Sequence, residues 1–133
     1  MKQNSILTEA PAFPSFSVDD LAKARTFYRD TLGLEVVDRP EGLELEVGSG
    51  SKVFVYPKPD HKPATFTILN FPVEDVEKAV DKLKSTGVRF EKYDLPDIKT
   101  DDRGIMSGAD GPAMAWFKDP AGNILSVLQE RGD

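Results

Sequence analysis

Cysteine is absent from this sequence, and its absence excludes disulfide bonds, thiolate metal sites and cysteine nucleophiles. Histidine occurs once, at His61. No apolar run reaches the length needed to cross a bilayer, and the first residues lack the basic-then-apolar pattern of a signal peptide. We therefore expect a cytoplasmic protein.

Basic residues are also fewer than acidic residues. Acidic residues outnumber them 23 to 17, which gives a net charge of −6 and a pI near 4.8. Such a balance argues against nucleic acid and against an anionic membrane as partners. The 133 residues are 39% hydrophobic and 30% charged, which is typical of a globular chain with its own core. We expect residues 1–133 to form one domain.

The sequence contains an internal repeat. Ser15–Thr31 aligns with Asn70–Thr86, and the identical positions pair Phe16 with Phe71, Val18 with Val73, Asp20 with Asp75, and Lys23-Ala24 with Lys78-Ala79. A repeat of this kind indicates two copies of one supersecondary unit that bury their apolar faces together. A working site between the two copies is then expected.

Each copy is predicted to run strand, helix and three strands. The first module covers about 11–57, a proline-rich linker covers 58–63, and the second module covers about 64–130. Expected in module one are a strand at 12–18, a helix at Ala22–Leu32 ended by Gly33, and strands at Leu34–Asp38, Leu43–Val47 and Lys52–Tyr56. Expected in module two are a strand at Thr65–Phe71, a helix at Val76–Lys84, and strands at Val88–Tyr93, Ala113–Lys118 and Asn123–Gln129.

The segment 95–112 has no counterpart in the first module. It is polar and contains glycine, and a loop of this length in a small domain is either a functional lid or simply mobile. Arg103 within it has two interpretations. It is a solvated residue in a local ion pair, or a lid residue whose fork pairs with a carboxylate or phosphate of a ligand.

Two motifs carry a resemblance to a known family. Asp20–Leu34 (DLAKARTFYRDTLGL) and the turn Asp119–Asn123 (DPAGN) within WFKDPAGNILSV resemble signatures of the vicinal oxygen chelate superfamily. That superfamily includes glyoxalase I, bleomycin-resistance proteins and extradiol dioxygenases. The resemblance implies an α+β fold in which two tandem βαβββ modules form a U-shaped, partly open barrel sheet with a ligand on its concave face. It also implies a homodimer, which the open sheet edges favour.

Enzymes of that superfamily hold a divalent metal on the concave face through His, Gln or Glu at defined positions of the strands. The positions fall on Phe13, on Ile68, on Ser126, and on Val55 or Tyr56. None supplies the imidazole nitrogen or carboxylate oxygen that such a metal prefers. His61 lies in the linker, where we expect a solvated residue. We therefore predict no metal and no cofactor.

Alternation along the strands predicts which side chains line the concave face. Phe13, Ser15 and Ser17 share one face of the first strand, and Ile124, Ser126 and Leu128 share one face of the last. No histidine is expected near these serines, so a serine nucleophile would lack a base. Trp116 is either a core anchor or a stacking surface for a planar ligand. The candidate ligand-binding residues are Phe13, Ser15, Tyr56, Ile68, Asn70, Arg103, Trp116 and Ser126.

The sequence favours metal-independent binding of a small organic molecule, cationic or aromatic rather than polyanionic because the protein is acidic. The alternative is an enzyme, a lyase, isomerase or dioxygenase-like protein that uses a metal or acid–base residues not identified by this reasoning. A third interpretation is a structural or regulatory dimer in which Phe13, Ile68 and Trp116 fill the cup. The sequence alone does not decide whether the protein is an enzyme.

Overall fold

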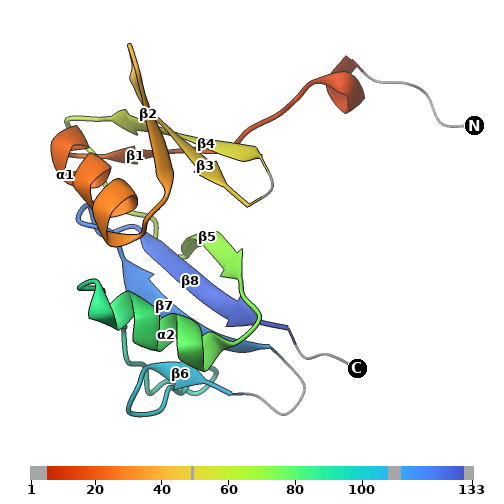
Figure 1. Cartoon of the computed structure of the whole chain (residues 1–133), viewed down its shortest axis with the longest axis vertical. Coiled ribbons are helices and arrows are strands. Elements are labelled where there is room, and N and C mark those ends of the chain that lie inside the picture. The colour runs from red at the N-terminus through yellow and green to blue at the C-terminus, as the bar shows by residue number, and fades with distance from the viewer. Residues whose placement is uncertain (1–5, 49, 108–111, 131–133) are drawn as a thin grey trace, which may run out of the picture.

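The structure is a computed structural model that describes residues 6–48, 50–107 and 112–130. In these ranges the chain forms two four-stranded mixed sheets that do not close on themselves, each with one α-helix against it (Figure 1). Module one contains β1 (Ser15–Val18), α1 (Leu21–Thr26), a π-helical turn η2 (Phe27–Thr31), β2 (Glu35–Arg39), β3 (Gly42–Val47) and β4 (Ser51–Pro57). Module two contains β5 (Thr67–Pro72), α2 (Val76–Ser85), β6 (Ile105–Met106), β7 (Ala113–Lys118) and β8 (Ile124–Gln129). A short 3-10 helix, η1 (Ile6–Glu9), precedes them on an arm that projects from module one (Figure 1).

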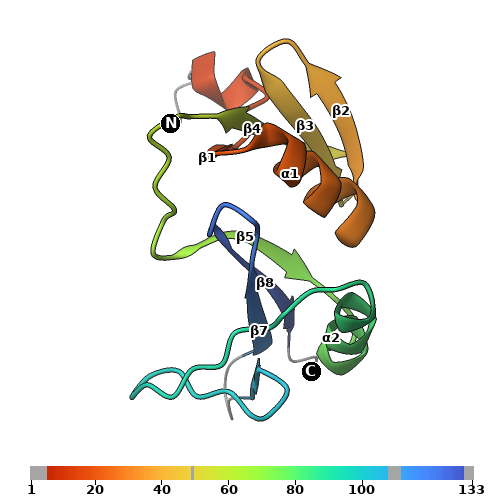
Figure 2. The ribbon, with the colours of Figure 1, turned by 90° about the vertical axis from the view of Figure 1, so that its left-hand side faces the viewer.

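The two sheets have the same topology, which confirms the paired-module fold. The strand orders are β1-β4-β3-β2 and β5-β8-β7-β6. In each sheet the first strand pairs in parallel with the last, and the remaining pairs are antiparallel. Figure 2 shows the modules one above the other, with the linker running along one side.

Equivalent residues of the repeat cap the N-termini of the two α-helices. The Asp20 side chain caps α1 by accepting from the Lys23 N–H at 3.1 Å, and Asp75 caps α2 by accepting from the Lys78 N–H at 3.1 Å. The predicted helix Ala22–Leu32 is observed as α1 followed by η2. It ends before Gly33, whose φ of 76° a side-chain-bearing residue rarely adopts.

The predicted strand Val88–Tyr93 is wrong. Only Phe90 bridges Phe117, and the Glu91 N–H donates to the Trp116 carbonyl at 2.8 Å. The outer edge of β7 is divided between two segments, because β6 pairs with Met114 and Ala115 further along the same edge. No uninterrupted edge is left on which residues 88–93 could extend into a strand.

Most of the segment 95–112 lies within the described residues. Thr100 donates to the Tyr93 carbonyl at 2.9 Å and Leu95 donates to the Ile98 carbonyl at 2.8 Å, which folds residues 93–100 into a small hairpin. The segment then supplies β6. Residues 108–111, which the lid prediction included, lie outside the described residues.

One apolar core joins the helix sides of both sheets. In module one it contains Val18, Tyr28, Leu43, Leu45 and Val55, and in module two Val80, Phe117, Leu125 and Val127. The rings of Phe27 and Phe117 lie 6.4 Å apart and carry the core across the two modules. The sheet faces opposite this core remain for a site.

Candidate functional site

Strand register fixes which side chains lie opposite the core. In β4, Val55 is fully buried in the core, so its neighbour Tyr56 points to the other face. Tyr56 pairs with Ser17, and Phe54 pairs with Ser15, so both serines of β1 share that face. Of the two residues considered for the first-module metal position, Tyr56 is therefore the one on the concave side.

A pocket of about 420 Å³ lies between the two modules, and we call it the inter-module pocket. Its wall from module one contains Ser15, Ser17 and Tyr56. Its other wall, from residues 61–69, contains His61, Phe66 and Ile68, among others. The structure thus brings together three of the candidate residues: Ser15, Tyr56 and Ile68.

A second pocket, of about 620 Å³, lies on the concave face of the second sheet, and we call it the aromatic pocket. Trp116 and Tyr93 meet there edge to face, with ring centroids 5.6 Å apart and planes at 71°. The Trp116 indole N–H donates to the Thr67 hydroxyl at 3.2 Å. The hairpin contributes Leu95 and Ile98 as the outer wall.

Burial raises the pKa of the Tyr93 phenol, and the negative charge of Glu91 raises it further. The phenol therefore stays protonated and neutral at physiological pH. It can offer its O–H as a donor, and its ring remains an apolar surface beside Trp116. The aromatic pocket thus combines planar apolar walls with a few hydroxyl groups.

Asn70 and Ser126 pair with each other on the same face of the second sheet as Trp116. Ser126 is fully buried, and its hydroxyl donates to Asn70 Oδ1 at 2.7 Å. Their strands align them directly, Asn70 opposite Ser126 and Ser126 opposite Trp116. The buried Ser126 hydroxyl therefore has its hydrogen-bond acceptor within the protein, in the side chain of Asn70.

Phe13 lies apart from the other candidates. Its side chain is 63% exposed and lines a separate depression of about 250 Å³ beside Arg39 and Glu44. Phe13, Ile68 and Trp116 therefore line three different depressions. A single cup filled by these three side chains, without a cavity, is therefore not observed.

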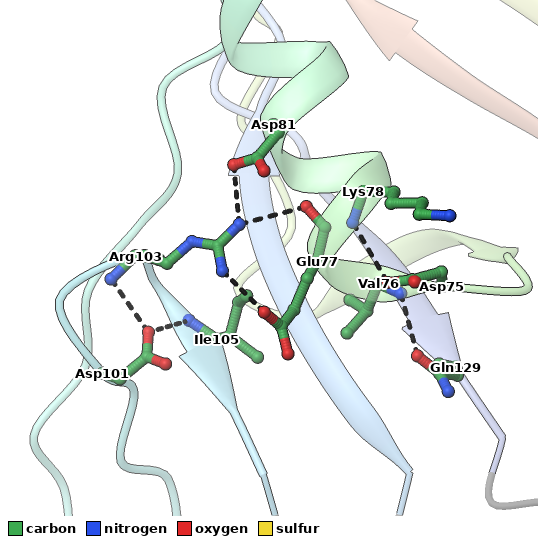
Figure 3. Close-up of polar contacts among 9 residues, drawn as sticks. All are labelled: Asp75, Val76, Glu77, Lys78, Asp81, Asp101, Arg103, Ile105 and Gln129. Carbon is green, nitrogen blue, oxygen red and sulfur yellow. Dashed lines mark hydrogen bonds and ion pairs between the residues drawn. The ribbon is translucent and has the colours of Figure 1, made fainter.

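Arg103 lies in the loop before β6, and its side chain reaches across to Glu77 and Asp81 of α2 (Figure 3). Its guanidinium donates to Glu77 Oε1 at 2.8 Å, to the Glu77 carbonyl at 3.1 Å and to Asp81 Oδ1 at 2.6 Å. Asp101 fixes the turn that presents it by accepting from the N–H groups of Arg103 and Ile105. The structure does not bring Arg103 together with the pocket residues.

His61 is not the solvated linker residue that we expected. Its Nδ1 lies 2.6 Å from Ser17 Oγ, and its Nε2 lies 3.1 Å from the Ala121 carbonyl oxygen. The expectation that no histidine reaches the serines of β1 is therefore wrong for Ser17. The contact spans 44 residues of sequence, and only the uniqueness of this histidine singled it out beforehand.

The turn Asp119–Asn123 joins the modules in addition to forming a hairpin. Asp119 Oδ1 accepts from the N–H groups of Ala121 and Asn123. The Asn123 side chain then donates to the Ser17 carbonyl at 3.0 Å. Asp119 Oδ2 accepts from the Tyr28 hydroxyl, and both burial and the Asp119 charge raise the pKa of that phenol.

The side chains at the predicted metal positions do not fit a divalent metal. Phe13 and Ile68 have no donor atoms, Tyr56 offers a phenol, and the Ser126 hydroxyl is engaged with Asn70. Across residues 6–48, 50–107 and 112–130, no group of three or more histidine, cysteine, aspartate or glutamate side chains could hold an ion.

Solved structures of the same fold are numerous. A genomically encoded fosfomycin resistance protein, FosX, from Listeria monocytogenes is 13% identical and superposes with a TM-score of 0.67 over 90% of this chain and 92% of its own. A superfamily member from Sphaerobacter thermophilus is 24% identical, with a TM-score of 0.65 over 90% and 97%. TnmS3, an antibiotic binding protein from Streptomyces, is 22% identical, with a TM-score of 0.61 over 92% and 98%. No curated protein matches this sequence.

The family assignment comes from the sequence itself. Residues 11–127 match the family described as "Glyoxalase/Bleomycin resistance protein/Dioxygenase superfamily". This range includes both modules, the linker and the turn Asp119–Asn123. The chain belongs to the glyoxalase/bleomycin resistance protein/dioxygenase superfamily.

Proposed function

We propose that this protein binds a small, partly aromatic organic molecule in the aromatic pocket and does so without a metal. The observation that carries the proposal is the edge-to-face pair of Trp116 and Tyr93, which lines a pocket with a volume of about 620 Å³. That volume lies within the range of pockets that hold small molecules. An aromatic ring can lie against either side chain at little cost in conformational entropy.

The polar groups of the pocket favour a ligand with few charges. Thr67 supplies a hydroxyl, already in contact with the indole N–H. Lys118 is the cation at the rim, and its Nζ lies 3.7 Å from Glu91 Oε1. Because this cation is partly neutralised and the whole protein carries −6, a neutral or cationic aromatic ligand is favoured over a polyanion.

Two proteins of the same fold guide the choice of compounds. One is named an antibiotic binding protein and the other a fosfomycin resistance protein. Aromatic antibiotics therefore form the first set of test ligands, and fosfomycin, which lacks an aromatic ring, is the contrasting compound.

The fluorescence of Trp116 tests the proposal directly, because it is the only tryptophan of the chain. A ligand that stacks on the indole is expected to quench its emission in a saturable titration. Leu95→Ala removes part of the outer wall and is expected to raise Kd about three- to tenfold. Ile6→Ala removes an equally apolar, exposed side chain far from the pocket and serves as the control.

Saturable quenching that weakens in Leu95→Ala and not in Ile6→Ala supports the site. Equal affinity in both variants would place the ligand elsewhere. Metal independence is tested in the same titration after dialysis against EDTA. A Kd that rises on EDTA treatment and recovers with Mn²⁺, Fe²⁺, Ni²⁺ or Zn²⁺ would contradict this part of the proposal.

We also propose a homodimer in the cytoplasm. The apolar side chains of Phe13 and Phe66 are 63% and 68% exposed, and the sheets have open edges that a second copy could cover. The chain carries no disulfide that would call for an oxidising compartment. Among the described residues, no helix is long and apolar enough to span a membrane. Light scattering on the purified protein measures the oligomeric state.

A further inference from the structure

We propose that Ser17 and His61 form a nucleophilic dyad that accepts an acyl group from a small activated ester in the inter-module pocket. The observation is the 2.6 Å contact between Ser17 Oγ and His61 Nδ1, at a pocket that both residues line. This activity goes beyond ligand binding in the aromatic pocket and does not depend on it.

The hydrogen bonds assign the protons of the histidine. A backbone carbonyl only accepts, so the 3.1 Å contact with the Ala121 oxygen requires the proton on Nε2. In the neutral ring Nδ1 is then the acceptor, and the Ser17 hydroxyl donates to it. This is the direction that a base needs in order to remove the proton of a serine nucleophile.

Three elements hold the dyad in place. Ser17 lies on β1, His61 on the linker, and the Ala121 carbonyl on the turn between β7 and β8. The turn is bonded to β1 as well, through the Asn123 side chain and the Ser17 carbonyl. The base is thus oriented by a third group, which is the arrangement expected of an activated serine.

The backbone of β1 offers a donor for the oxyanion. β1 is an edge strand, and it pairs with β4 through the carbonyls of Pro14 and Val18. Successive residues of a strand direct their backbone groups to opposite edges, so the Ser17 N–H and carbonyl point away from β4. The Ser17 carbonyl is bonded there to Asn123, and the Ser17 N–H points to the same edge.

The reaction balances without a further reagent. Ser17 Oγ bonds to the ester carbonyl carbon while its proton passes to His61 Nδ1. The ester C–O bond then breaks, and the leaving oxygen takes that proton and departs as an alcohol. Water attacks the acyl-serine, gives its proton to Nδ1, and releases a carboxylic acid as the proton returns to Ser17 Oγ.

The pocket selects the class of ester. Its walls include Phe16, Val53, Tyr56, Phe66 and Ile68, which suit a short apolar acyl chain. Lys62 is the only cation among its lining residues and lies in the linker beside His61. A volume of about 420 Å³ accommodates an ester of small-molecule size.

A fluorophosphonate probe and p-nitrophenyl acetate test the dyad on the intact protein. The probe replaces fluoride by an Oγ–P bond only at an activated serine. One adduct per chain is expected, and peptide mapping is expected to place it on Ser17. Ser15, two residues away on the same face and without a bonded histidine, is expected to stay unmodified. The ester is expected to release nitrophenol in a burst of about one equivalent per chain.

Ser17→Ala is expected to abolish the adduct and the burst, and His61→Gln to slow both at least tenfold. Ser51→Ala, at an exposed serine outside the pocket, is the control. Circular dichroism establishes that each variant is folded. The position of the adduct in the wild-type protein is a test that does not depend on any variant. No adduct, or an adduct on Lys62, Tyr56 or Ser15, would overturn the proposal. Labelling by the probe tests Ser17, and the fluorescence titration tests ligand binding beside Trp116. The dyad and the ligand-binding proposal can therefore fail independently of each other.

Discussion

The Tyr28 hydroxyl donates a 2.7 Å hydrogen bond to Asp119 Oδ2, and the two residues are 91 positions apart in the sequence. Tyr28 is fully buried in η2, directly after α1, and Asp119 begins the turn between β7 and β8. This one bond therefore ties the helix side of module one to the hairpin of module two. It lies beside the turn that also orients His61.

Tyr28→Phe is expected to destabilise the protein by about 1.5–3 kcal/mol, because a buried hydrogen bond to a charged group is lost. The lower end of the range is favoured, since Asp119 Oδ2 keeps its bond from the Asn123 side chain at 3.0 Å. Urea denaturation measures the loss. Tyr56→Phe removes a phenol outside this network and serves as the control. An equal loss in both variants would show that the bond between modules contributes nothing of its own.

Gly42→Ala is expected to be more damaging than its small size suggests. A Cβ at Gly42 would lie 2.1 Å from the Val55 carbonyl oxygen, so β3 and β4 would have to separate. We expect a loss of about 3 kcal/mol, the upper end for overpacking. Gly33→Ala is the comparison, because its cost is backbone strain alone, about 1–2 kcal/mol at a φ of 76° with open space around it. Thermal denaturation ranks the two, and a smaller loss at Gly42 would contradict the close approach.

The sequence predicted the modules well because their signals are local. Strand Ala113–Lys118 is observed with the predicted bounds, and the predicted helix Val76–Lys84 differs from α2 by one residue. The repeat paired Asp20 with Asp75, and both cap their helices. Alternation likewise placed Ser15 and Ser17 opposite the core.

The sequence failed where position depends on tertiary contacts. Residues 88–93 have the composition of a strand, but β6 occupies part of the edge that they would need. His61 has no local pattern, and its two partners come from β1 and from the turn at Ala121. The division of the concave side into two pockets follows from the path of the linker, which no periodicity encodes.

Arg103→Ala tests whether this residue contacts a ligand. Its ion pairs with Glu77 and Asp81 are exposed, so we expect a small decrease in Tm and an unchanged Kd in the Trp116 titration. Lys82→Ala, at an exposed cation of α2, controls for the loss of positive charge. A tenfold rise in Kd for Arg103→Ala alone would restore the interpretation of Arg103 as a lid residue that binds an anionic group.

The Asp101 carboxyl makes the stability of the folded protein depend on pH in the acidic range. The N–H of Ile105, then the N–H and charge of Arg103, lower the pKa of the Asp101 carboxyl. A carboxyl whose pKa is lower in the folded state stabilises the protein above the pKa of the unfolded state, near 3.9. The stabilisation is lost as the pH falls through the lowered pKa.

Asp101→Asn keeps the acceptor oxygen and removes the charge. The wild-type protein is therefore expected to have the higher Tm at pH 7, and the difference is expected to shrink below about pH 4 as Asp101 becomes protonated. Asp102→Asn, at the exposed neighbouring residue, removes the same charge and is the control. Thermal denaturation across this range measures both variants. A difference for Asp101→Asn that stays constant into strong acid would show that the amide costs stability for steric reasons and not through charge.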